Sequence, residues 1–158
     1  MSQKGYEIGT LIGTIDPQVI TTAEVYTDVI DMSDFDQVTF YFLIGGGEAA
    51  PLGSANIDAR VVTCNAAGDN RAAFKTADLI NDSASSNINL QIIVNISAED
   101  LAGGAANADR YVRGGIEAGS QEIEVACAVI GYLPKHGPAH ADLPDLASIR
   151  EIEDDKDD

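Results

Sequence analysis

Two stretches of this chain, 37–44 (QVTFYFLI) and 87–96 (NINLQIIVNI), decide its fold class. In the first stretch every second residue is branched or aromatic, and these residues share one face of an extended chain: Val38, Phe40, Phe42 and Ile44. The second stretch places an unbroken apolar face against a polar face that only Ile93 interrupts. Period-two alternation of this kind predicts β-strands, so one side of each strand should pack on a core.

The other face of 37–44 is unusual for a strand at the surface. It carries Thr39, Tyr41 and Leu43, so it is semi-apolar rather than polar. A strand of an antiparallel sheet usually turns its second face to water. We therefore expect something to cover this face.

The rest of the chain reads as further short strands separated by turns. Strands are expected at 19–26, 29–32, 56–65, 110–117 and 121–132, the last two joined by a tight hairpin at Ala118, Gly119 and Ser120. The polar stretch 66–86 is expected to be a long excursion between strands. Ser97 followed by Glu99 and Asp100 predicts one helical turn over 97–101. Many strands with little helix predict an all-β fold, an antiparallel β-sandwich of jelly-roll or immunoglobulin-like type.

Composition changes at both ends of the sandwich. Residues 1–17 predict an N-terminal arm, because glycine recurs every four residues and few apolar residues lie between. The sandwich domain is expected over 18–133. Three prolines after Leu133 oppose a regular strand, so 134–158 is expected to be a C-terminal arm with an acidic tail. Its apolar residues recur every three positions, as in a short amphipathic helix, and we expect the arm to contact other proteins through Leu143, Leu146 and Ile149.

The chain is strongly acidic, with 9 basic and 26 acidic residues and a net charge of −17. Nucleic-acid binding depends on Lys and Arg displacing counterions, so this class of partner is excluded. The surface also repels anionic membranes, and no apolar run approaches the ~20 residues of a membrane span. A partner should be neutral or basic at the contact, or the contact should be largely apolar. Alternatively, the charge serves only solubility.

The cysteines and the N-terminus indicate the cellular compartment in which the protein is made. Cys64 and Cys127 both fall in expected strands, where a buried free thiol is the favoured interpretation and a disulfide between facing strands is the alternative. The N-terminus lacks the continuous apolar region of a signal peptide. We therefore expect synthesis in the cytoplasm.

No catalytic or metal-binding pattern emerges. The glycine-rich stretch 45–54 lacks the lysine of a phosphate-binding loop. His136 and His140 have helical spacing, but Pro138 lies between them and opposes a helix. The acidic cluster at 28–36 lacks the order of an EF-hand, and no GxSxG elbow occurs. We expect no enzyme activity, no metal and no cofactor.

Four short motifs in order resemble small virion structural proteins of tailed bacteriophages: DMSDFDQVTFYFLIGG at 31–46, DARVV at 58–62, ADRYVRGGI at 108–116 and AVIGYLP at 128–134. The resemblance covers about residues 20–134. It implies a head decoration (cement) protein that binds the major capsid protein on the outside of the assembled capsid, commonly as a homotrimer made in the host cytoplasm. A tail or head-tail connector component is one alternative. A β-sandwich module that binds calcium or carbohydrate is the other.

The late R-Y-V-R element supplies the remaining candidate contact residues: Arg110, Tyr111 and Arg113. Residues three apart on a strand point to opposite faces, so we expect the two arginines to diverge. At least one should pair with carboxylates across strands or subunits. Alternatively, Tyr111 only packs against neighbouring residues, and the aliphatic parts of the arginine side chains lie on apolar surface while their charged ends stay in water.

Overall fold

The computed structural model describes residues 9–21, 23–46, 57–79, 90–102, 110–118 and 122–134. These residues form strands and one short helix, with the bounds β1 Gly9–Ile20, β2 Glu24–Tyr26, β3 Ile30–Asp31, β4 Phe35–Gly46, β5 Ile57–Cys64, β6 Asn70–Leu79, β7 Leu90–Ser97, α1 Ala98–Ala102, β8 Tyr111–Glu117 and β9 Ile123–Pro134.

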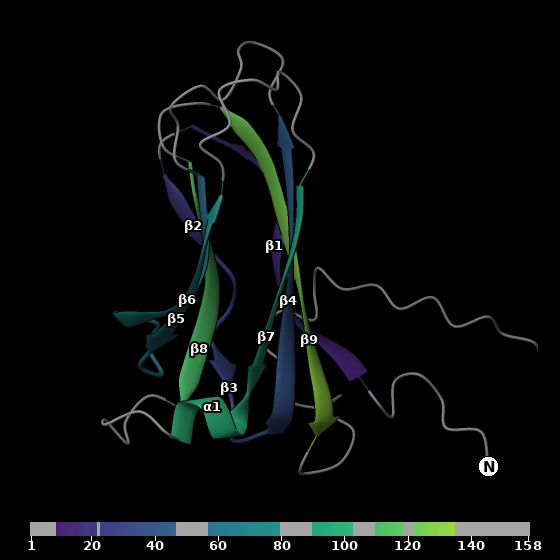
Figure 1. Ribbon diagram of the computed structural model, residues 1–158, viewed down its shortest axis with the longest axis vertical. Coiled ribbons are helices and arrows are strands. Elements are labelled where there is room, and N and C mark those ends of the chain that lie inside the picture. The colour runs from purple at the N-terminus through teal and green to yellow at the C-terminus, as the bar shows by residue number, and fades with distance from the viewer. Residues whose placement is uncertain are drawn as a thin grey trace, which may run out of the picture.

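The strands form two antiparallel sheets that face each other as layers (Figure 1). The first, sheet A, has the strand order β1-β9-β4-β7. The second, sheet B, has the order β2-β8-β5-β6, and β3 pairs with β8 on the same side as β2. The all-β sandwich predicted from the alternating stretches is therefore confirmed.

The path of the chain between the sheets distinguishes the two sandwich types. Strands β2 and β3 occupy one edge position, so each sheet has four positions, and the chain crosses from one sheet to the other at almost every connection. The first and last strands, β1 and β9, lie side by side in sheet A. This is the jelly-roll arrangement of two Greek keys. In an immunoglobulin sandwich, several hairpin-linked strands are neighbours in one sheet, whereas among the described strands only the consecutive pair β5 and β6 is so joined.

The same topology corrects the expected hairpin before the last strand. β8 belongs to sheet B and β9 to sheet A, so these two strands do not pair. The turn-forming residues at 118–120 predicted a reversal of the chain, but their type does not specify which sheet the next strand joins.

The core lies between the sheets and is centred on β4. Val38, Phe40 and Phe42 of this strand are fully buried, and the two phenyl rings are nearly parallel with centroids 6.1 Å apart. On the opposite sheet the rings meet Gly114 of β8: a Cβ atom there would lie 2.8 Å from Phe40 Cδ1 and 2.9 Å from Phe42 Cζ. Glycine is therefore required at this position for the two sheets to approach.

Two segments that were expected to be irregular are strands. Residues 9–17, assigned to the N-terminal arm, form most of β1, whose side chains Ile12 and Ile15 are buried. Pro17 lies where the register shifts between Ile15 and Gln18, on an edge strand, and such a position tolerates a missing N–H. Within 66–86, residues 70–79 form β6, paired along its length with β5.

The helical turn is confirmed as α1 at Ala98–Ala102. The Asp100 N–H donates to Ser97 Oγ at 3.2 Å, and the Ser97 N–H donates to Asp100 Oδ2 at 3.0 Å, which is a reciprocal cap. The short strand predicted at 29–32 is present as β3, and a turn follows it. The C-terminal contact residues Leu143, Leu146 and Ile149 lie outside the described residues, as do residues 1–8.

Both cysteines are buried free thiols, as the favoured interpretation predicted. Cys127 lies in the core row of sheet A between Ile15 and Phe42. Burial raises the pKa of its thiol to about 12, although a hydrogen bond with the Tyr41 backbone acts in the opposite direction.

Substitution of Gly114 tests whether the packing of the two sheets requires a residue without a side chain at this position. Gly114→Ala should lower the free energy of unfolding by about 1–3 kcal/mol, because the added methyl overpacks two rings that have no free space. Gly115→Ala is the control on the outer face and should cost less, because its Cβ would meet Tyr26 and Glu24, which are half-buried rather than enclosed between the sheets. Urea unfolding measures both. Equal losses would contradict the packing argument.

The Cys127 thiol predicts a loss of stability in alkali. Between the pKa of an unfolded cysteine, about 8.5, and the folded value of about 12, the unfolded chain has lost this proton while the native chain retains it. The unfolded state then binds fewer protons, so stability falls as pH rises, by up to about 1.4 kcal/mol per unit. The stability advantage of the wild type over Cys127→Ala should therefore shrink between about pH 9 and pH 11. An advantage independent of pH would contradict the burial argument.

Candidate interaction faces

The R-Y-V-R element lies on the outer face of sheet B. Tyr111 and Arg113 alternate with the buried Val112 and therefore share that face. Arg110 precedes the strand, and its guanidinium lies 4.9 Å from the centre of the Tyr111 ring. The two arginines consequently do not diverge, because the alternation rule applies only within the strand.

Each residue of this element is held by contacts within the chain. Arg110 donates a short hydrogen bond to Asp31 on β3, and this bond raises the pKa of the arginine. The guanidinium carbon of Arg113 lies 3.8 Å from the centre of the Tyr26 ring on β2, a cation–π arrangement. The cross-strand pairing expected for at least one arginine is present. Whether these residues also touch another protein stays a prediction.

A row of carboxylates crosses the same face. Glu24 of β2, Glu117 of β8 and Asp58 of β5 are direct cross-strand neighbours. Arg60, one row away, donates through Nε to Glu24 Oε1 at 2.7 Å and lies 3.6 Å from Glu117 Oε2. The bond to Glu24 raises the pKa of Arg60 despite partial burial. Like charges directly opposite each other destabilise a sheet, so Arg60 holds this row together.

The outer face of sheet A has a different character. Its rows are fixed by the register of the four strands, and its residues are mostly apolar or uncharged: Leu11, Thr14, Asp16, Pro17 and Val19 on β1; Glu124, Ala126, Ala128, Ile130 and Tyr132 on β9; Gln37, Thr39, Tyr41 and Leu43 on β4; and Gln91, Ile93 and Asn95 on β7. We call this set the sheet A face. It includes the described large hydrophobic side chains that are most exposed, Val19 at 54%, Leu43 at 48% and Ile93 at 59%.

Polar groups on the sheet A face pair with one another. The Thr39 hydroxyl donates to Asn95 Oδ1 at 2.7 Å across the β4–β7 pair. The hydroxyls of Tyr41 and Tyr132 lie 3.4 Å apart, and this contact, together with some burial, raises the pKa of Tyr41. These side chains satisfy each other, so the face presents few polar groups in need of a partner.

Charge is divided unequally between the two sheets. The strands of sheet A, as the structure delimits them, contain no lysine or arginine, and their only acidic residues are Asp16, Asp36 and Glu124. The strands of sheet B contain four basic residues: Arg60, Arg71, Lys75 and Arg113. The sheet A face therefore has no cation of its own.

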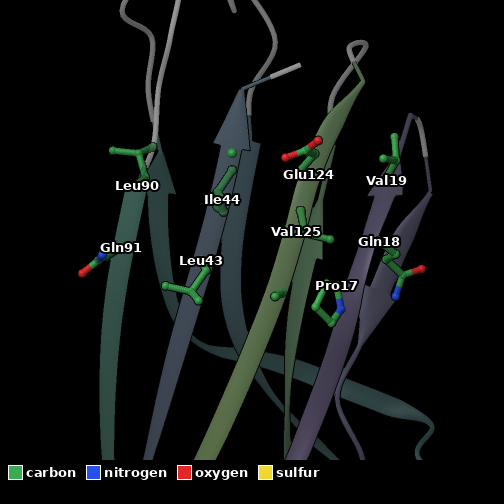
Figure 2. Close-up of a pocket in the computed structure, with 11 residues that line it drawn as sticks. Pro17, Gln18, Val19, Leu43, Ile44, Leu90, Gln91, Glu124 and Val125 are labelled. Carbon is green, nitrogen blue, oxygen red and sulfur yellow. The ribbon is translucent and has the colours of Figure 1, made fainter. Parts of the chain in front are cut away.

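A groove of about 530 Å³ lies at one end of sheet A. Figure 2 shows its lining residues in strand order, from Leu90 and Gln91 on β7 through Leu43 and Glu124 to Pro17 and Val19 on β1. Small residues in the middle explain the hollow, because Gly45 and Ala126 lie between larger side chains on either side. The described lining contains no aromatic residue.

Sequence reasoning found the apolar second face of β4 but not its extent. Leu43 and Tyr41 indicated that face directly, and Ile93 was visible as an interruption in a polar row. What joins them is the strand order, which brings Tyr41 beside Ile93 and Leu43 beside Ala126. Nothing within the described residues covers Leu43 or Ile93, contrary to the expected covering.

The described residues show neither a metal-binding group nor a membrane-spanning helix. The described residues contain no group of three or more histidine, cysteine or carboxylate side chains placed to hold a metal ion. In the acidic cluster, Asp31 accepts from the Ser33 N–H at 2.9 Å as well as from Arg110, which is the behaviour of a turn-capping residue. The described helix is too short to cross a membrane.

Because Arg60 compensates the row of carboxylates, its removal should lower the free energy of unfolding by an amount that depends on salt. Arg60→Gln should lower the free energy of unfolding by about 1 kcal/mol at low salt, because Glu24, Glu117 and Asp58 then repel without compensation. The loss should shrink in 1 M salt, where the screening length is about 3 Å. Arg110→Gln is the control and should cost clearly less, since Arg110 is 59% exposed. Equal, salt-independent losses would contradict this account.

Comparison with known proteins leaves the family open. No family model matches the chain, and no curated protein matches it. Among solved structures, the crystal structure of an infectious bursal disease virus VP2 subviral particle matches with a TM-score of 0.38 and 12% sequence identity, over 85% of this chain and 44% of that chain. This chain thus spans less than half of the viral chain's length. A similarity this low adds nothing to the description of the fold, which rests on the strand order.

Proposed function

We propose that this chain is a virion structural protein of a tailed bacteriophage, a head decoration (cement) protein that binds the outer surface of the assembled capsid as a homotrimer. Its partner is the major capsid protein, and it performs no catalysis. The proposal places the protein on the capsid exterior after synthesis in the host cytoplasm.

The sheet A face is the observation that carries this proposal. With strands ~4.8 Å apart and ~3.3 Å per residue, four strands over eight residues present roughly 500 Å². A broad, nearly uncharged face on a chain of net charge −17 suits contact with another protein surface. The ordered motifs around β4, β5, β8 and β9 supply the link to phage virions, because they resemble proteins of that class.

Net charge supports the exterior position. A homotrimer triples a charge that is already −17 per chain. Packaged DNA would repel such an assembly on the inside of the shell, whereas the outside imposes no such cost. The same charge argues against a role in binding DNA at the head-tail junction.

A ligand-binding sandwich module is the second candidate, and the groove on sheet A is the observation that favours it. Gln18, Gln91 and Glu124 line it and offer hydrogen-bonding groups. Carbohydrate sites usually add aromatic platforms, which the described lining lacks. Calorimetry with calcium and a panel of glycans tests this candidate, and measurable binding would favour it over the capsid role.

The capsid role predicts saturable binding to heads. The test uses heads assembled from the major capsid protein encoded in the same genome, freed of other surface proteins, and mixed with the purified chain. We expect co-sedimentation that saturates, and a trimer mass for the free protein by light scattering. A strict monomer that stays in the supernatant would contradict the proposal, and rings or tubes in negative stain would favour the tail or connector alternative. An unrelated acidic protein of similar size is the control.

A further inference from the structure

The sheet A face is open in the described chain, and its chemistry restricts what can cover it. Leu43 and Ile93 are diagonal neighbours on adjacent strands, and Val19 lies near the opposite edge beside Glu124. The three side chains are each about half exposed. An occupant must therefore bring apolar atoms to the middle of the face.

Charge at the end of the face restricts the occupant further. Glu124 is exposed in the row of Val19 and Gly45, next to the groove. None of the strands of sheet A provides a lysine or arginine to neutralise it. The remaining charge on the molecule is also predominantly negative, so a basic rim on the occupant is attracted at long range and at contact.

A second copy of this chain meets the apolar requirement but not the requirement for basic residues at the rim. Two sheet A faces placed together would bring Glu124 against a surface that has no cation, and each chain adds a net charge of −17. The apolar residues could still touch, but like charges would oppose the approach. A different protein with the opposite charge pattern fits better.

We infer that the sheet A face docks on a different protein chain whose contact surface has an apolar centre and lysine or arginine side chains at its rim. Within the proposed function, on which this inference rests, that surface belongs to the major capsid protein in the assembled shell. Self-association of the trimer then uses other parts of the chain.

Footprinting of the free protein tests whether the face is available. Hydroxyl-radical labelling should oxidise Leu43 and Ile93 in the free protein, and heads of the same phage should protect both residues. Labelling of Glu99 and Leu101 in α1, at the other end of β7, is the internal reference. Protection of Leu43 and Ile93 already present in the free protein would overturn the inference, because a second copy or residues 135–158 of the same chain would then cover the face.

Variants test the chemistry of the contact. The double substitution Leu43→Thr and Ile93→Thr keeps residues suited to strands, and it should weaken binding to heads at least ~10-fold while the circular dichroism spectrum and the trimer mass stay unchanged. Glu124→Gln should slow association ~2–3-fold at low salt and reduce its salt dependence. Glu99→Gln removes the same charge from exposed α1 and is the matched control, expected to leave both unchanged.

The outcomes separate this inference from the proposed function. If the wild type binds heads and the threonine double variant binds equally well, the docking face is wrong and the capsid role stands. If the double variant falls apart into monomers, the face joins copies of this chain and the inference is overturned. If Glu124→Gln and Glu99→Gln behave alike, the basic rim is wrong. If the wild type does not bind heads at all, the proposed function fails, and the partner named here fails with it.

Discussion

The contact between the two phenyl rings of β4 and the bare backbone at Gly114 sets the geometry of the sandwich. Phe40 and Phe42 occupy the centre of one sheet, and their ring edges meet a glycine on the other, where a Cβ atom would clash with both rings. This contact fixes the distance between the layers at the middle of the molecule. It also determines which face of β4 points inward, so Tyr41 and Leu43 must point outward.

That constraint explains how one sequence pattern produces both a core and an interaction face. A period-two strand that is apolar on both sides can be buried on only one side of a two-layer sandwich. The second apolar side of β4 is extended by neighbours on β7 and β9, because the jelly-roll order places those strands on either side of it. Sheet B receives the basic residues and forms its own internal ion pairs around Arg60 and Arg110. The molecule thus has one face with ion pairs within the chain and another that carries no cation.

The strands with strict alternation could be predicted from the sequence, and those without it could not. β4, β7 and β9 alternate over most of their lengths, and each was found within a few residues of its bounds. β1 was missed because glycines and Pro17 interrupt it, although Ile12 and Ile15 anchor it in the core. β6 was missed because its partner β5 defines it, and long-range pairing leaves little local signal. Long-range pairing also explains why the sequence predicted only part of the sheet A face. The apolar second face of β4 could be seen in the sequence, but the neighbours that complete it come from segments about 50 to 90 residues away.

The size of the sheet A face has a consequence for assembly. A partner that covers roughly 500 Å² buries about 1,000 Å² in total, which is the lower end for a specific interface. A contact of this size is typical of weak or transient binding by a single copy. Three linked copies that engage three equivalent surfaces convert the second and third contacts into intramolecular events, and avidity can exceed single-site affinity by ~10²–10⁴. In the proposed trimer, a modest, nearly uncharged face and a threefold assembly would be complementary features, because a small contact keeps each copy reversible and three contacts together make the attachment durable.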